Sequence, residues 1–265
     1  MFGLFKRAKA SNLFHKPGVM TEDFNPSPRQ PCFCESGKSF AECCGAKRII
    51  RKPPFGVFVF ENYLEPEFVR QLREFADQRE GHPLMMIDHE KSTPDDIVKI
   101  ADNRRVTERV ELGGRRDEIN ELVRSIYVKL AQKCFGKKLD WFESPDLMRY
   151  RPNGHYLKHA DSENMNPATQ KWDKVIDRDI SLLIYLNDDF EGGELTFTKF
   201  NYKLRPTAGT VVLFPSDHRY MHQAEIVKSG LRYAIVSWSS IMGMPKIAKK
   251  PPVCAIPVEY KLEMN

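Results

Sequence analysis

His159, Asp161 and His222 are the residues whose types and spacing could together bind a metal ion. His159 and Asp161 are two positions apart, and alternate side chains of an extended segment lie on the same face. Alone this pair is a weak signal, because an isolated histidine more often has a structural role. A third ligand must come from elsewhere, and His222 is the best candidate. Two histidines and one carboxylate form the facial triad that holds non-haem iron(II) and leaves coordination positions open.

Arg232 is a charged residue within an otherwise apolar segment, residues 231–238, which reads LRYAIVSW. A charge in such a strand needs a buried partner. A guanidinium can bind a carboxylate through two hydrogen bonds, whereas a lysine would act as a looser point charge. An ordinary surface salt bridge is the alternative. We therefore expect Arg232 to pair with a carboxylate of a bound molecule near the metal site.

The predicted secondary structure changes along the chain, from a strand and two helices at the start to short strands from residue 147 onward. A strand is expected at 55–60, a helix at 65–78 with Pro66 in its first turn, and a second helix at 117–133 with one apolar stripe. From residue 147 onward the chain has short β-rich runs without intervening helices, which favours an antiparallel sandwich or jelly roll. These runs are 148–150, 180–186, 195–200, 210–214 and 233–238. We expect an α+β fold with flanking N-terminal helices.

Composition places the chain among folded globular proteins. Of its 265 residues 41% are hydrophobic and 29% charged, so neither a disordered nor a fibrous protein is favoured. No apolar run approaches the roughly 20 residues of a membrane helix, and the N-terminus lacks a secretory signal. We therefore expect a cytoplasmic protein with no membrane partner and with cysteines that are reduced or bind metal.

The net charge of +5 lies in the N-terminal extension. Residues 1–53 hold ten Lys/Arg against four Asp/Glu, or +6, which leaves 31 basic and 32 acidic residues, or −1, for residues 54–265. A basic segment of this kind can contact nucleic acid, a ribosomal surface or anionic lipid. A solvated tail with no target is an equally simple reading.

The segment Tyr150–Asp161, which reads YRPNGHYLKHAD, resembles the pattern of the prolyl 4-hydroxylase family of Fe(II)/2-oxoglutarate-dependent dioxygenases. It departs from the pattern at Asn153, where a second glycine often stands. Four later segments resemble the family in the family's order, so the resemblance covers roughly residues 55–240. They are 185–187 (YLN), 191–195 (EGGEL), 206–210 (PTAGT) and 213–216 (LFPS).

This resemblance implies a double-stranded β-helix, or jelly roll, with the first two iron ligands near the end of one strand and His222 on a facing strand. It also implies that Tyr150 and Tyr185 line the pocket of 2-oxoglutarate and that Tyr185 donates to the carboxylate bound by Arg232. Trp238 would form a wall of that pocket, or else be a core aromatic residue. The implied cofactors are Fe(II), 2-oxoglutarate and O2, with ascorbate as a further one, and the products are succinate and CO2.

Four cysteines are clustered near the N-terminus, which is the stoichiometry of a zinc site. Their spacing resembles the SEC-C motif, with departures at Phe33 and Glu35. A Zn(II) ion held by four thiolates is coordinatively closed, so a structural or docking role is expected rather than catalysis. Unligated cysteines in a tail are the alternative. The cysteines are Cys32, Cys34, Cys43 and Cys44.

The sequence favours hydroxylation of a prolyl residue in a protein substrate, with the zinc motif directed to a ribosome- or translation-associated partner by analogy. A hydroxylase of a free amino acid or other small metabolite, an oxidative demethylase of nucleic acid and a non-catalytic binding module remain open. The expected division is a basic irregular segment, a SEC-C-like motif, the dioxygenase domain and a C-terminal tail, at 1–30, 31–50, 54–243 and 244–265 respectively.

Overall fold

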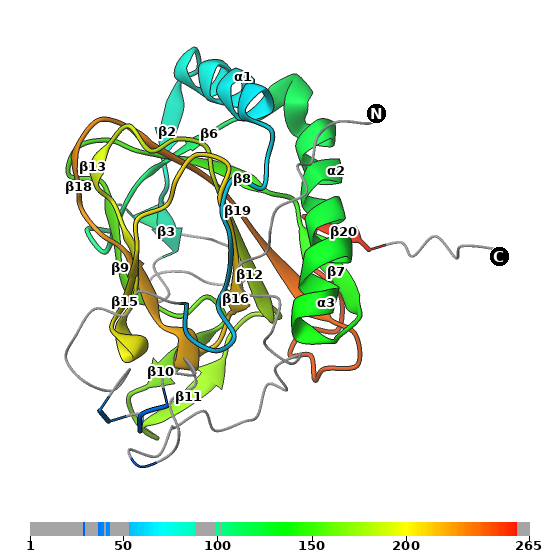
Figure 1. Ribbon diagram of the computed structural model, residues 1–265. Helices are drawn as coiled ribbons and strands as arrows, with labels where there is room; N and C mark the ends of the chain where they lie inside the picture. The colour runs from blue at the N-terminus through cyan, green and yellow to red at the C-terminus, as the bar shows by residue number, and fades with distance from the viewer. Residues whose placement is uncertain are drawn as a thin grey trace.

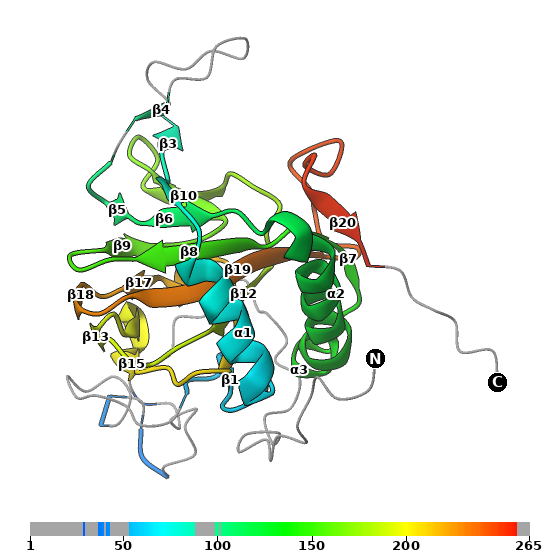
Figure 2. The same cartoon turned by 90° about the horizontal axis from the view of Figure 1, so that it is seen from above.

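The computed structural model describes residues 53–87, 99–100 and 102–258, together with positions 29, 37–39, 41 and 42. Two β-sheets pack face to face, and helices cover the outer face of the larger sheet (Figure 1, Figure 2). Every strand pairing in the described part of the chain is antiparallel. The expected α+β jelly-roll fold is confirmed.

The larger sheet has nine strands and carries the residue expected to bind a carboxylate. Arg232 begins its longest strand, β19, which also pairs with β7 and through it with β20 from the C-terminal region. In sheet order the strands are β1 (Phe58–Phe60), β16 (Val211–Pro215), β12 (Ile180–Tyr185), β19 (Arg232–Ile241), β8 (Asp146–Tyr150), β6 (Glu108–Val110) and β2 (Gly81–Pro83), with β7 (Leu139–Glu143) and β20 (Ala255–Pro257) at the far end of β19.

The smaller sheet carries the expected metal ligands. Its five strands in order are β15 (Tyr202–Leu204), β14 (Leu195–Phe197), β17 (His222–Ala224), β9 (His155–His159) and β5 (Arg105–Val106). Three two-stranded ribbons complete the β-structure: β3 (Met86–Ile87) with β4 (Lys99–Ile100), β10 (Glu163–Asn166) with β11 (Lys171–Lys174), and β13 (Glu191–Gly192) with β18 (Val227–Ser229). Short 3-10 helices occupy Gly113–Arg115, Thr198–Phe200 and His218–Tyr220.

The helices form where apolar residues recur at helical spacing. Helix α1 (Pro66–Asp77) begins with proline, which loses no intrahelical hydrogen bond in the first turn, and buries Phe68, Val69, Leu72 and Ala76. Helix α2 (Arg116–Ile126) continues through a π-helical turn (Tyr127–Ala131) into α3 (Gln132–Phe135) as one rod (Figure 1). Gly136 ends the rod in the left-handed conformation, at φ 63°. None of the described helices has the length and hydrophobicity needed to cross a bilayer.

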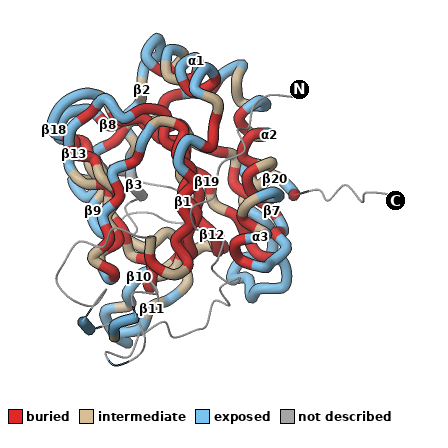
Figure 3. Tube along the Cα trace, in the orientation of Figure 1, coloured by how far each residue is buried: buried red, intermediate tan, exposed pale blue. Residues whose placement is uncertain are grey.

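Alternation along the central strands decides which side chains point between the two sheets. In β12, Ile180, Leu182 and Ile184 belong to the core beneath the helices, whereas Tyr185 belongs to the core between the sheets. Successive side chains of a strand point to opposite faces, so Ser181 lies on the same inner face as Tyr185. Most residues of these strands are buried (Figure 3). The interior between the sheets is therefore where polar side chains can form a site.

The sequence-based elements agree with the structure in kind and differ at their ends. The predicted run 195–200 is a strand only to Phe197, because residues Thr198–Phe200 form a 3-10 turn. Strand β7 and the short strands β10, β11 and β15 were not among the predicted runs. The cysteine cluster and most of the basic segment lie outside the described residues, so the proposed division of the chain stays a prediction.

Candidate active site

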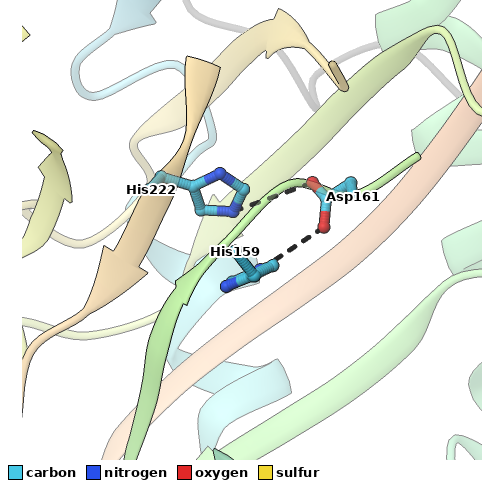
Figure 4. A group of neighbouring side chains, drawn as sticks. All are labelled: His159, Asp161 and His222. Atoms are coloured by element: carbon cyan, nitrogen blue, oxygen red, sulfur yellow. Dashed lines mark ion pairs between the residues drawn. The ribbon is translucent and has the colours of Figure 1, made fainter. Parts of the chain in front are cut away.

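His159, Asp161 and His222 come together at one end of the interior between the sheets (Figure 4). Their potential ligand atoms all lie within 4.8 Å of one another. The Asp161 carboxylate lies 3.5 Å from Nε2 of His159 and 3.7 Å from Nε2 of His222. His222 is 5% exposed, and both imidazole rings turn Nε2 toward the carboxylate. The three donors predicted from the sequence are thus brought together.

The strand pairing explains this convergence. β9 and β17 are neighbours in the smaller sheet, and His159 pairs directly with His222 across them. Asp161 follows the end of β9. The expectation that His222 stands on a facing strand is therefore corrected, because the two ligand strands are hydrogen-bonded neighbours of one sheet. Neighbouring strands lie about 4.8 Å apart, which is close enough for side chains on one face to share a metal ion.

Backbone carbonyl groups fix the orientation of both imidazole rings. Nδ1 of His159 lies 2.7 Å from the carbonyl oxygen of Leu157, and Nδ1 of His222 lies 3.1 Å from that of Tyr220. A carbonyl can only accept, so each Nδ1 carries the proton and each Nε2 keeps a free lone pair. Hydrogen bonding of the remote ring nitrogen is the usual arrangement in metal-binding histidines.

The electrostatic environment favours the protonation states in which His222 and Asp161 can bind a metal ion. Burial, with a smaller contribution from the charge of His159, lowers the pKa of His222 to about 4, so its imidazole is neutral at neutral pH. Burial alone would raise the pKa of Asp161, but the neighbouring His222 and His159 and the hydrogen bond from Ser181 hold that pKa well below its usual value. Two imidazole nitrogens beside one carboxylate are a donor set that fits a divalent cation.

Ser181 positions the carboxylate of Asp161. Its hydroxyl donates to Oδ2 of Asp161 at 2.6 Å and lies 2.8 Å from the hydroxyl of Ser216. The backbone N–H groups of Asp161 and Ser162 both donate to the Ser216 carbonyl. These bonds fasten the turn after β9 to the larger sheet, so the carboxylate is held from both sheets.

Replacing Ser181 with alanine should lower the affinity for iron(II) by about 10- to 100-fold, because a ligand loses the hydrogen bond that orients it. Titration of the metal-free protein with iron(II) under anaerobic conditions measures this change. Ser181→Thr, which keeps the hydroxyl, should restore most of the affinity. Ser237→Ala is the matched control, since this buried serine donates to the carbonyl of Glu143 on the other face of the larger sheet. Equal affinities in the two alanine variants would contradict the role of Ser181.

Arg232 is a buried cation with unfilled hydrogen-bonding capacity. Its residue exposure is 2%, and its Nη2 donates to the hydroxyl of Tyr185 at 3.2 Å. Its Nε and Nη1 are buried without a hydrogen-bond partner among the described residues. A buried donor without a partner costs about 1–3 kcal/mol, and more on a charged group. The geometry suits a ligand carboxylate that would fill both donors.

Tyr150 and Tyr185 enclose the Arg232 guanidinium. Its central carbon lies 4.5 Å from the ring centroid of Tyr150 and 5.0 Å from that of Tyr185. Burial raises the pKa of Tyr185, which keeps its proton available to a carboxylate. Trp238 pairs with Ser181 near the metal-binding residues and packs against the same hydrophobic cluster as Tyr150. Its place as a wall of the co-substrate pocket stays a prediction.

A family model for the 2OG-Fe(II) oxygenase superfamily matches residues 145–240, which contain the triad and Arg232. This part of the chain is similar to that superfamily. A second model, for the SEC-C motif, matches residues 29–46. Both resemblances read from the residues are thereby confirmed. The oxygenase match begins in β8 and ends in β19, so it includes all of β9 and β17.

Two relatives of known name match part of the chain. A PKHD-type hydroxylase of Crocosphaera subtropica is 34% identical over 126 residues, which are 45% of this chain and 50% of the relative. Human prolyl 3-hydroxylase 2 is 35% identical over 92 residues, 31% of this chain and 13% of the relative. The chain thus spans half the length of the first relative and much less of the second.

A solved structure shares the fold of the oxygenase domain. It is a prolyl hydroxylase from Trichoplax adhaerens in complex with a peptide fragment of the hypoxia inducible factor oxygen degradation domain. The TM-score is 0.52 at 20% sequence identity, covering 70% of this chain and 84% of that one. At this identity the likeness supports the jelly-roll fold alone.

Sequence reasoning missed two contributors near the metal end of the oxygenase domain. Ser181 is one, and Arg178 is the other. Arg178 donates through Nε and Nη2 to both carboxylate oxygens of Glu143 and lies 3.7 Å from the ring centroid of Trp238. No local pattern marks these residues, because their partners come from distant strands. The serine within an otherwise apolar strand, ISLLIY, was the one available signal.

Proposed function

We propose that this chain is an iron(II)- and 2-oxoglutarate-dependent dioxygenase that hydroxylates a prolyl residue of a protein, with release of succinate and CO2. The observation that carries the proposal is that two features share the interior between the two sheets. One is the set of three metal donors, and the other is the buried Arg232 with two unfilled donors. A dicarboxylate that reaches a metal at one end needs a fixed cation at the other.

Each part of the site has a role in this reaction. Bound iron and 2-oxoglutarate would supply the oxidising chemistry from O2. His159, Asp161 and His222 hold the metal from one side and leave its other positions open. Arg232 and Tyr185 fix the far carboxylate of the co-substrate. The apolar residues between the sheets exclude water from the reacting centre.

A prolyl residue in a protein is the proposed target because the relatives named above are hydroxylases, of which one is a prolyl 3-hydroxylase. The solved structure with the shared fold holds a peptide. Residues 54–265 carry a balance of −1, from 31 basic and 32 acidic residues, which gives little support to a nucleic-acid substrate. We expect the hydroxyl at C4, from the resemblance to prolyl 4-hydroxylases.

Mass spectrometry of a treated lysate tests this function. The iron-loaded protein is incubated with lysate, 2-oxoglutarate and O2, and peptides are searched for proline residues heavier by one oxygen. The Asp161→Ala protein serves as the control. Amino-acid analysis of the product distinguishes 3- from 4-hydroxyproline. Succinate formed with free amino acids or nucleic acid, and with no modified protein, would contradict the prolyl substrate.

The SEC-C match supports a second metal site in the N-terminal segment. Of the matched residues 29–46 the structure describes positions 29, 37–39, 41 and 42, and Gly37 has a left-handed backbone with φ 74°. The four cysteines lie outside the described residues. We propose that they bind one zinc ion and that the motif docks a protein partner, by analogy a translation-associated one. A cytoplasmic location and use of ascorbate remain part of the proposal.

Purified protein should contain about one zinc per chain, and this zinc should remain when the iron ligands are replaced. Replacing Cys32, Cys34, Cys43 and Cys44 with serine should remove the zinc and leave 2-oxoglutarate turnover on a short peptide largely intact. Elemental analysis of the purified variants measures the metal content. The exposed Cys254 is the control position, since Cys254→Ser should leave the zinc in place. Zinc that persists in the fourfold variant would contradict the site.

A further inference from the structure

Arg105 is a guanidinium near the metal-binding residues that has no carboxylate partner among the residues that the structure describes. Its Nη2 lies 3.8 Å from the sulfur of Met148, which is a weak acceptor. Its Nε is buried without a hydrogen-bond partner among the described residues. The residue itself is half-buried at the start of β5. A partly buried guanidinium with a donor left unfilled is stabilised when a bound ligand places an anion beside it.

The neighbouring arginines differ from Arg105 because each is paired with a carboxylate. Arg104 pairs with Asp102 at 2.6 Å. Arg149 and Arg151 share Glu108, at 2.6 and 2.8 Å. Within the described part of the chain, the carboxylates of Asp102 and Glu108 are therefore already paired with other arginines, and Arg105 has no such pair.

The position of Arg105 links it to the metal site. Its central carbon lies 4.6 Å from the ring centroid of Tyr156, its partner across β5 and β9. The Tyr156 ring stacks on His159, with centroids 3.5 Å apart and planes 16° apart. A bulge in the pairing of β9 with β17 puts one extra residue between Tyr156 and His159, which explains how both side chains reach the same side.

A cavity opens next to Arg105. It has a volume of about 320 Å³ and is lined by Leu84, Met85, Asn103, Arg105, Thr107 and Gly154, among others. This volume is at the lower end of the range for ligand pockets, enough for a side chain or a chain end. Thr107 is buried and its hydroxyl donates to the carbonyl of Arg149, so this wall is fixed.

We propose that Arg105 and this cavity bind a carboxylate of the substrate, so that the enzyme selects substrates with an acidic group close to the reacting residue. The proposal rests on the function proposed above and names the chemistry of its substrate. The carboxylate belongs either to an aspartate or glutamate side chain or to a free chain end. Both sources present the same group to the guanidinium.

Binding of matched peptides tests the subsite without requiring turnover. The probes are end-blocked peptides with one central proline, in which a neighbouring position holds Asp, Asn or Lys. A series of such peptides places this Asp, Asn or Lys at successive positions along the peptide. A further peptide ends at the same place with a free carboxylate. Affinity is measured anaerobically with 2-oxoglutarate and with Mn(II) in place of Fe(II), by calorimetry.

In the unmodified protein one Asp peptide should bind about 10- to 100-fold more tightly than its Asn counterpart, as expected for a charge-assisted hydrogen bond. Arg105→Gln should remove this preference, and Arg105→Glu should reverse it toward the Lys peptide. Arg104→Gln is the matched control, because that neighbouring arginine is exposed and already paired, and it should keep the preference. Tighter binding of the free-ended peptide alone would assign the carboxylate to a chain end.

Equal affinity for Asp, Asn and free-ended peptides would overturn the subsite, as would an unchanged preference in Arg105→Glu protein. Folding of each variant is checked by thermal unfolding and by the absorption band that forms when 2-oxoglutarate joins iron(II) without oxygen. Oxidation of peptides without any acidic preference would reject the subsite and leave the proposed function standing. An acidic preference in binding, without oxidation of any peptide, would support the subsite and reject the function.

Discussion

Replacing His159, Asp161 or His222 with alanine, one at a time, is expected to abolish turnover of 2-oxoglutarate. Each variant loses one of three ligands in a site whose donor atoms lie within 4.8 Å of one another. We expect the affinity for iron(II) to fall on the order of a hundredfold or more, above the loss typical of outer-shell changes. Anaerobic metal titration and succinate formation measure the two effects separately.

The control for the ligand variants is His82→Ala. His82 is an exposed histidine of β2 in the larger sheet, and its loss should change neither iron affinity nor succinate formation. Thermal unfolding of the metal-free variants separates loss of a ligand from loss of the fold. Normal turnover in any one of the three ligand variants would contradict the triad.

The second large effect is expected from Arg232→Gln, which should raise the Michaelis constant for 2-oxoglutarate while the protein still binds iron. Removing one partner of a buried, hydrogen-bonded charge pair costs about 2–5 kcal/mol, or roughly 30-fold to several thousandfold in affinity. The reason is that the co-substrate carboxylate would lie buried without its cation. Titration with 2-oxoglutarate at saturating iron(II) measures this change.

Two conservative variants test the geometry around Arg232. Arg232→Lys keeps the charge but loses the two parallel donors, so it should recover only part of the affinity. Tyr185→Phe removes a hydrogen bond to charged groups, the Arg232 guanidinium and the co-substrate carboxylate, and should cost about 1.5–3 kcal/mol, or roughly 13- to 160-fold. An unchanged Michaelis constant in Arg232→Gln would refute the role of this residue. A fall in iron affinity of equal size would show a general disturbance instead.

Arg232 should also make the protein respond to its co-substrate before any reaction. Its buried Nε and Nη1 lack partners, so a bound carboxylate should stabilise the folded state. We expect 2-oxoglutarate with Mn(II) to raise the unfolding temperature of the unmodified protein and to have little effect on Arg232→Gln. This comparison needs no catalysis, so it separates binding from turnover.

Local patterns in the sequence were enough to predict the candidate metal ligands, the helices and the class of fold. His159 and Asp161 are close in the chain, so their common face follows from the extended backbone alone. Arg232 could be identified because a charge in an apolar strand is costly without a partner. The helix at Pro66–Asp77 follows from local spacing of apolar residues, which needs no knowledge of distant contacts.

Which distant residues contact these groups depends on the tertiary fold. The pairing of β9 with β17 places His222 beside His159, and β12 brings Ser181 to Asp161. Arg105 differs from its neighbours because the described carboxylates near it form ion pairs with other arginines. Strand pairing depends on contacts between residues far apart in the chain, and local spacing carries no record of which partner each charge will find. The bulge that stacks Tyr156 on His159 is likewise a property of two strands together.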